Sequence, residues 1–157
     1  MTPLSEAGYD SIVASAIDAD GNVFVGGQSW NGADFDAFVL KYRPDGSLDP
    51  SFGIFRYDGG FDESVSALAL DASGNVVVAG SRVMWGLNSN ILLFRVTPAG
   101  ALDGSLGVVV YDGSNSDGAG GVSVEGDDIW IAGSTYDAWY DVLLLRYSST
   151  GALLLEK

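Results

Sequence analysis

The chain has 157 residues, of which 47% are apolar, 22 are glycine and only 4 are proline. This apolar fraction is enough to bury a core, and the glycine content fits many tight turns between short strands, so we expect one all-β domain. Twenty-one acidic residues against 7 basic ones give a net charge of −14. Such a charge disfavours nucleic acid and anionic membrane surfaces as partners.

The sequence contains no cysteine and no histidine, which excludes disulfides, thiolate or imidazole metal sites and Ser-His catalysis. Any enzyme activity would therefore depend on carboxylates. No apolar run approaches the roughly 20 residues of a membrane-spanning helix, and residues 1–6 lack the basic and apolar regions of a signal peptide. We expect a soluble chain without a cofactor, and secretion or a cell-surface location stays open.

One unit repeats three times along the sequence. Glycines at positions 27, 80 and 133 are spaced by 53 residues, and an apolar strand pattern surrounds each of them. In chain order, each unit predicts four strands, which we call A to D. These are 12–17, 23–27, 36–42 and 54–57 in the first unit, 65–70, 76–80, 90–96 and 108–111 in the second, and 121–124, 129–133, 141–147 and a short segment from 153 in the third.

Strand C is apolar on both of its alternating faces, as in the run from Ile91 to Phe94, so it should be covered on both sides. Four-stranded sheets stacked around an axis provide this cover, and about four to eight of them close a ring. Because three blades cannot close, we predict half of a β-propeller that is completed by oligomerisation, six-bladed as a dimer. A β-trefoil, which uses three four-stranded units and closes as a monomer, is the alternative fold.

The succession of motifs also resembles a known family. Gly74-Asn75-Val76 through Gly80-Ser81, Asp36 through Tyr42, and Asp45 through Gly53 together resemble the bacterial propeller repeats called SBBP and the related delta-sixty repeats. The third unit departs most, with Asp127-Asp128 in the turn and Leu153-Leu154-Leu155 in place of the longer connection. The resemblance covers nearly the whole chain and implies a propeller, but it implies no activity.

The chain forms a single repeat domain, residues 1–157, with approximate blade units at 9–58, 62–112 and 116–157. The last strand D stops short at Lys157, and residues 1–8 occupy the part of the repeat that comes just before the first strand A. We therefore expect residues 1–8 of another subunit to complete the last blade, which makes the protein a homo-oligomer with a dimer preferred. An excised fragment and an engineered origin are the open alternatives.

Aromatic side chains recur in the loops between strands B and C, on the same rim as the acidic loops between strands D and A. The candidate ligand-binding residues on this rim are Trp30, Trp85, Tyr136, Trp139, Asp58 and Asp112. Aromatic rings beside carboxylates suit sugars, although packing between blades would also explain the rings. We predict a non-catalytic scaffold or interaction module, with a carbohydrate-binding, lectin-like ring as the alternative and a protein ligand also open.

A glycosidase would need two carboxylates about 5 to 10 Å apart. Asp58 and Asp112 are the first candidates for such a pair, but both belong to repeated Tyr-Asp-Gly turns, as structural residues do. We therefore predict no enzyme activity and no catalytic residues.

Charged residues also recur at fixed positions of the repeat. We predict structural ion pairs between the basic set in strand C and the acidic set that closes strand A. These sets are Lys41, Arg95 and Arg146, and Asp18, Asp71 and Glu125. The run Asp18-Ala19-Asp20-Gly21-Asn22 resembles a calcium loop, but Ser29 stands where the bidentate Glu is expected, so we interpret it as a turn and predict no metal site.

Overall fold

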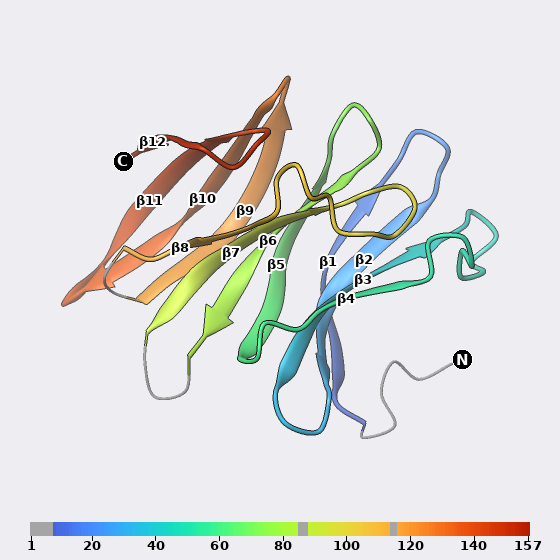
Figure 1. Ribbon diagram of the computed structural model, residues 1–157, viewed down its shortest axis with the longest axis horizontal. Helices are drawn as coiled ribbons and strands as arrows, with labels where there is room; N and C mark the ends of the chain where they lie inside the picture. The colour runs from blue at the N-terminus through green and yellow to red at the C-terminus, as the bar shows by residue number, and fades with distance from the viewer. Residues whose placement is uncertain (1–7, 85–87, 114–115) are drawn as a thin grey trace.

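A computed structural model describes residues 8–84, 88–113 and 116–157, and strands are the only regular elements in these ranges. The strands form three four-stranded antiparallel sheets that lie side by side, with the first and third sheets at opposite ends of the stack (Figure 1). We call these sheets blades 1, 2 and 3. Within each blade the strands follow one another in chain order, joined by turns and loops.

The twelve strands have the following bounds. Blade 1 contains β1 (Asp10–Ile17), β2 (Val23–Trp30), β3 (Phe35–Tyr42) and β4 (Ile54–Tyr57). Blade 2 contains β5 (Asp62–Leu70), β6 (Val76–Val83), β7 (Ser89–Val96) and β8 (Val108–Tyr111). Blade 3 contains β9 (Ser116–Glu125), β10 (Asp128–Asp137), β11 (Trp139–Ser148) and β12 (Leu153–Glu156).

The blades stack as in a β-propeller. Strand β5 packs against β1, β2 and β3 of blade 1, and β9 packs against β5, β6 and β7 of blade 2. Among the described residues, no hydrogen-bonded strand pairing joins one sheet to another. The propeller prediction is therefore confirmed, and the β-trefoil is wrong, because a trefoil would pair strands of all three units in one common barrel.

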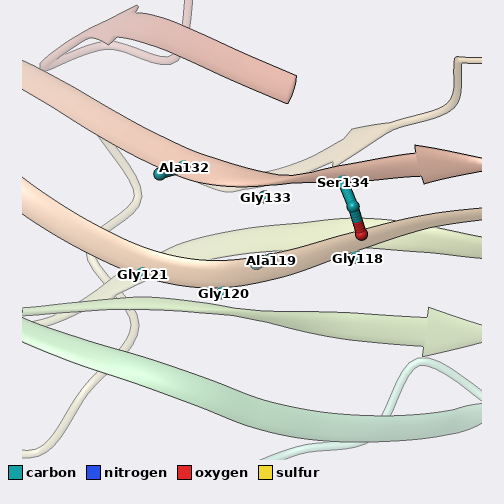
Figure 2. A pocket seen from close by; sticks show the side chains of 7 residues that line it. All are labelled: Gly118, Ala119, Gly120, Gly121, Ala132, Gly133 and Ser134. Carbon is teal, nitrogen blue, oxygen red and sulfur yellow. The ribbon is translucent and has the colours of Figure 1, made fainter. Parts of the chain in front are cut away.

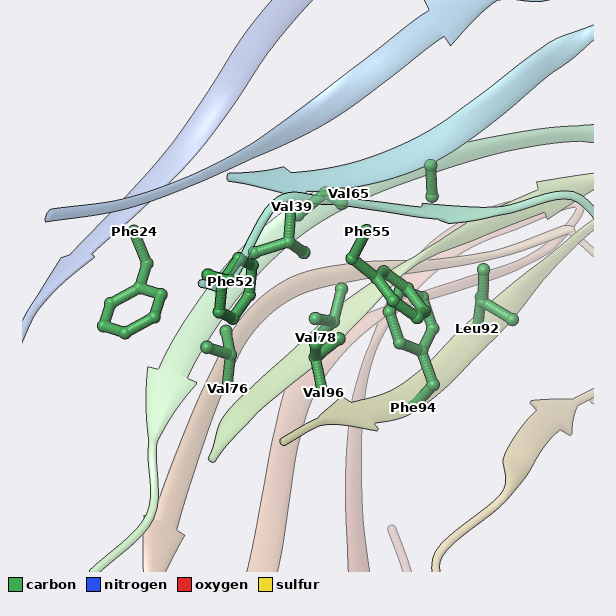
Figure 3. Close-up of a cluster of buried hydrophobic side chains, with 11 residues drawn as sticks. Phe24, Val39, Phe52, Phe55, Val65, Val76, Val78, Leu92, Phe94 and Val96 are labelled. Carbon is green, nitrogen blue, oxygen red and sulfur yellow. The ribbon is translucent and has the colours of Figure 1, made fainter. Parts of the chain in front are cut away.

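Two apolar clusters hold the stack together. The cluster between blades 1 and 2 includes the fully buried Phe94, whose ring lies 5.5 Å from that of Phe55 (Figure 3). The ring of Tyr57 also lies 5.4 Å from that of Phe94. The second cluster joins Ile91 and Leu93 of blade 2 to blade 3. Strand β7 thus buries alternate side chains in opposite clusters, which is the double cover that its sequence predicts.

The glycines that mark the repeat have a common physical cause. A β-bulge in the first strand of each blade shifts the register opposite Gly27, Gly80 and Gly133. A Cβ atom added at any of the three would overlap a backbone carbonyl oxygen of that neighbouring strand. The repeat therefore keeps glycine at this position because no side chain fits there.

Blade 3 differs from the other two at its outer strand. Strands β4 and β8 pair opposite residues 37–40 and 91–94, whereas β12 pairs opposite residues 145–147. The chain itself thus supplies four strands to blade 3, and the β11 edge at Val142 and Leu143 has no partner strand among the described residues. Completion of this blade by residues 1–8 of another subunit stays a prediction, and residues 1–7 lie outside the described ranges.

Candidate functional site: the loop rim and the open blade faces

The loops predicted to form a rim do gather at one edge of the stack. The hairpins between β2 and β3 and between β10 and β11, together with the linker between β4 and β5, lie on the lower side of Figure 1. The backbone N–H of Phe35 donates to a carboxylate oxygen of Asp62 at 3.1 Å, which ties the hairpin of blade 1 to the start of blade 2. The rim is therefore built from both hairpins and blade junctions.

The aromatic residues on the rim form two cross-strand pairs, with one more tryptophan beside the second pair. Trp30 packs edge-on against Phe35 with ring centroids 5.1 Å apart, and Tyr136 and Tyr140 form the corresponding cross-strand pair in blade 3 at 5.0 Å. These pairs stabilise the mouths of the two hairpins. Trp139 is 80% exposed beside the second pair. Trp85 lies outside the described residues.

The carboxylates of Asp34, Asp36 and Asp58 come together at the junction of blades 1 and 2, each with an oxygen within 4.8 Å of the others. The amide of Asn31 donates to Asp36 at 2.8 Å and also to Asp34. Burial raises the pKa of Asp36, because removal from water disfavours its charged form. Within the cluster, a local amide thus already bonds to the two buried carboxylates.

Two acids that the sequence predicts on the rim, Glu63 and Asp117, follow the Tyr-Asp-Gly turns and are buried. The backbone N–H of Gly59 donates to Glu63 at 3.0 Å, and that of Gly113 donates to Asp117 at 2.7 Å. Glu63 is fully buried and Asp117 is 1% exposed. Both stand four residues after the glycine, and this repeated spacing could have indicated their hydrogen bond to its N–H group. Asp58 therefore belongs to a repeated blade junction, as does Asp112 beside Gly113.

The recurring ion pairs lie within blades and agree only in part with the predicted pairing. Arg95 contacts the predicted Asp71 at 3.6 Å and also Asp103 at 2.6 Å. Lys41 contacts Asp49 at 3.6 Å instead of Asp18, and Arg146 contacts Asp128 instead of Glu125. The connections after β3 and β7 supply Asp49 and Asp103, whose side chains reach back toward strand C. Arg95 also donates to the carbonyl oxygen of Ser149 at 3.2 Å, which ties blade 2 to blade 3.

The calcium-like run is a turn. One carboxylate oxygen of Asp18 accepts the N–H groups of Asp20 and Asn22, and the other accepts the Asn22 side-chain amide at 2.8 Å. The Asn22 side-chain hydrogen bond is the main reason that the pKa of Asp18 lies below its usual value. Asp71 makes the same bonds in blade 2, so the acid closes the hairpin in both of these blades.

The two end faces of the stack are apolar and open. We call the face of a blade that points to the preceding blade its leading face, and the opposite face its trailing face. In strand register, Ile12 of β1 stands opposite Gly27 as Val65 of β5 stands opposite Gly80. Val65 is 1% exposed against blade 1, whereas Ile12 is 61% exposed on the leading face of blade 1.

The trailing face of blade 3 shows the same contrast. Ala37, Ile91 and Val142 occupy one repeated position on the third strand of each blade. Ala37 is 0% and Ile91 is 1% exposed, because the next blade covers each of them, whereas Val142 is 84% exposed. Beside it, an open groove of about 500 Å³ lies between β9 and β10 (Figure 2). Its lining residues are Gly118, Ala119, Gly120, Gly121, Ala132, Gly133 and Ser134.

Exposure of large apolar side chains is concentrated at these two ends. Those that are more than half exposed among the described residues are Tyr9, Ile12, Val13, Ile17, Trp139, Tyr140, Val142 and Leu154. All of them belong to blade 1 or blade 3, at or beside β1, β11 and β12. In blade 2, Val83 and Leu102 reach only 36% and 40%. The exposed apolar surface therefore coincides with the faces that lack a neighbouring blade.

The comparisons with known proteins agree with this architecture. Residues 19–52 match the family model described as a domain of unknown function (DUF5122) beta-propeller. The match spans β2, β3 and the connection that follows them in blade 1. It supports a β-propeller repeat but does not distinguish SBBP repeats within that class. A search of curated proteins found no match. Among the described residues, no helix has the length and apolar character that a membrane crossing requires.

Proposed function

We propose that this chain is a non-catalytic β-propeller scaffold module that assembles through its open blade faces into a closed ring. The observation that carries the proposal is the contrast between Val142, 84% exposed, and its equivalents Ala37 and Ile91, which are 0% and 1% exposed between blades. Large exposed apolar faces usually mark surfaces that contact another molecule. A face built as one half of a blade contact is best covered by another blade.

Two copies would supply six blades. Propellers have about four to eight blades, and six is the only multiple of three in that range. In the repeat, residues 1–8 of each copy correspond to β4 and the linker that follows it. They could therefore extend the outer strand of the other copy's blade 3 along the β11 edge at Val142 and Leu143. This is blade completion between subunits, and it would join the two copies at both contacts.

We propose that the chain is not catalytic because the positions of its candidate acids have a structural explanation. Asp58 lies with Asp34 and Asp36 around the Asn31 amide, and Asp112 precedes the glycine that bonds Asp117. Each acid recurs with the blade junction, so its position is explained by the architecture. A chromogenic glycoside panel tests this, and turnover that Asp112→Asn abolishes would overturn the non-catalytic assignment.

The assembly is tested by the molar mass in solution. Sedimentation equilibrium or light scattering should give twice the single-chain mass of 16.3 kDa. A species of single-chain mass at micromolar concentration would refute the ring, and it would mean that other blades of a longer protein cover these faces. A mass that increases without limit with concentration would also refute it, because it would indicate open polymers.

A second function, carbohydrate binding, is favoured by the hairpin that joins β10 and β11. Trp139 and Tyr140 are 80% and 78% exposed, and Asp137 and Asp141 beside them are also exposed. Sugars stack on such rings while carboxylates accept their hydroxyls. Glycans should then quench tryptophan fluorescence, and Trp139→Ala should lose the response whereas Trp30→Ala keeps it. A glycan panel without effect would remove this function. A protein ligand on the same rim would leave the glycan panel silent and require its own binding assay.

A further inference from the structure

We infer that β1 of a second copy occupies the groove on blade 3, in the register that β5 adopts on blade 1. This inference rests on the proposed ring assembly and adds to it the identity of the contacting residues. It places Ile12 of one copy over Ala132 of the other. The contact between copies would thereby repeat the contact between consecutive blades of one chain.

The template is the packing of β5 on blade 1. A Cβ atom added at Gly26 would lie 2.9 Å from a Val65 methyl and 3.3 Å from the Leu68 methyls. These two side chains of blade 2 therefore fill the space directly above the Gly26 backbone on the trailing face of blade 1. The same cluster buries Val39, which stands opposite Gly26 on β3.

Strand register transfers this contact to the ends of the stack. Ala132 stands opposite Leu144 as Gly26 stands opposite Val39, so Ala132 is the Gly26 position of blade 3. Ala132 is exposed and lines the groove, whereas Gly26 is buried under the next blade (Figure 2). In the same way Ile12 is the Val65 position of blade 1. The groove on blade 3 therefore corresponds to the space on blade 1 that Val65 fills.

The sizes of the side chains fit this assignment. Ile12 stands where Val65 does and Ala132 stands where Gly26 does, so each adds one carbon atom to the contact. Ser15 stands where Leu68 fills the interior contact, and Gly121 stands where the other blades have Ala14 and Ala67, so both free space beside the larger pair. The larger residues of the contact therefore meet smaller neighbours, as close packing requires.

A second contact at the rim follows from the same register. Phe35 of blade 1 bonds to Asp62, which begins β5. The equivalent of Phe35 in blade 3 is Tyr140, and the equivalent of Asp62 in blade 1 is Tyr9. Tyr140 is 78% and Tyr9 is 71% exposed. The ring would place these two aromatic side chains together, which accounts for much of the exposed aromatic surface at both ends.

Disulfide trapping tests the register, because the chain has no native cysteine. The test variant carries Ile12→Cys and Ala132→Cys, both at exposed positions, so its folding should be unaffected. Residues in this contact should come close enough for a disulfide, for which Cβ atoms stand about 4 Å apart. Oxidation should shift the variant from one-chain to two-chain mass on a non-reducing gel, with loss of all free thiols.

Two matched variants calibrate the result. Ala79→Cys with Ala119→Cys repeats the pair at the contact between blades 2 and 3, and it should lose its thiols while keeping one-chain mass. Ile12→Cys with Val83→Cys places the second thiol on the middle blade and should not form two-chain species.

The outcomes separate the register from the assembly. A two-chain mass in solution without trapping of Ile12→Cys and Ala132→Cys, while the internal pair oxidises, would overturn the register and leave the ring standing. A one-chain mass in solution would overturn the ring itself, and the register with it. Equal trapping of the Val83→Cys variant would overturn the register too, since it would indicate random collision.

Discussion

Replacing Val142 with alanine tests the open trailing face by a graded loss of apolar contact. The substitution removes two methyl groups from a side chain that is 84% exposed in the single chain. At about 0.8 kcal/mol for each buried group, full coverage of this exposed part is worth about 1.3 kcal/mol. The position occurs twice in a two-copy ring, so the loss is about 2.7 kcal/mol, and the dissociation constant should rise roughly 100-fold.

Sedimentation equilibrium over a range of concentrations measures this dissociation constant. Val83→Ala is the matched control, because it makes the same chemical change on the middle blade, where the side chain is 36% exposed. The control should leave the dissociation constant unchanged. Val142→Ala should also leave the unfolding free energy of the separated chain within about 0.5 kcal/mol, since the side chain contacts little there. If the two variants dissociate equally, the trailing face is not the contact and the reasoning fails.

Three further substitutions test the interior. Gly80→Ala should cost about 3 kcal/mol in urea unfolding, because its Cβ overlaps the facing carbonyl oxygen, whereas Gly104→Ala, with open space around it, should cost under about 0.5 kcal/mol. Arg95→Ala should cost about 3 kcal/mol by leaving the partly buried Asp71 and Asp103 without their cation, against less than about 1 kcal/mol for Arg43→Ala, whose side chain is 47% exposed. Burial raises the folded-state pKa of Glu63 above its usual value, so the free energy of unfolding should fall as the pH rises above about 4.5. Glu63→Gln should weaken that fall, and an unchanged pH profile would contradict the assignment.

The strands could be predicted from sequence where apolar residues alternate. The predicted bounds of β4 and β8 agree with the structure, and β7 fills both faces as expected. Strand β9 was predicted only from residue 121, whereas it begins at Ser116. Its first half contains the run Gly118-Ala119-Gly120-Gly121, which has no apolar alternation. Pairing with β10 and packing on blade 2 hold this run extended, and neither is visible in local sequence.

The candidate site could be predicted less well, because it depends on contacts between distant residues. Trp30 was grouped with exposed platforms, but its cross-strand partner Phe35 makes it part of the hairpin mouth. Glu63 and Asp117 were expected on the rim and are buried, since only the folded linker brings each one to a glycine N–H. Lys41 pairs with Asp49 for a similar reason, because the connection after β3 folds back along strand C.

The contact between copies decides whether the module closes or polymerises. A leading face that binds a trailing face is a head-to-tail contact, and such contacts give rings when the rotation closes and filaments when it does not. Three blades that each contribute 60° of a six-bladed ring rotate the chain by half a turn, so the second copy brings its own trailing face back to the first. Both apolar faces are then covered at once, and the net charge of −14 on each chain disfavours further association. Closure therefore depends on the angle between blades, which the interior contacts of Gly26 with Val65 and Leu68 already fix within each chain.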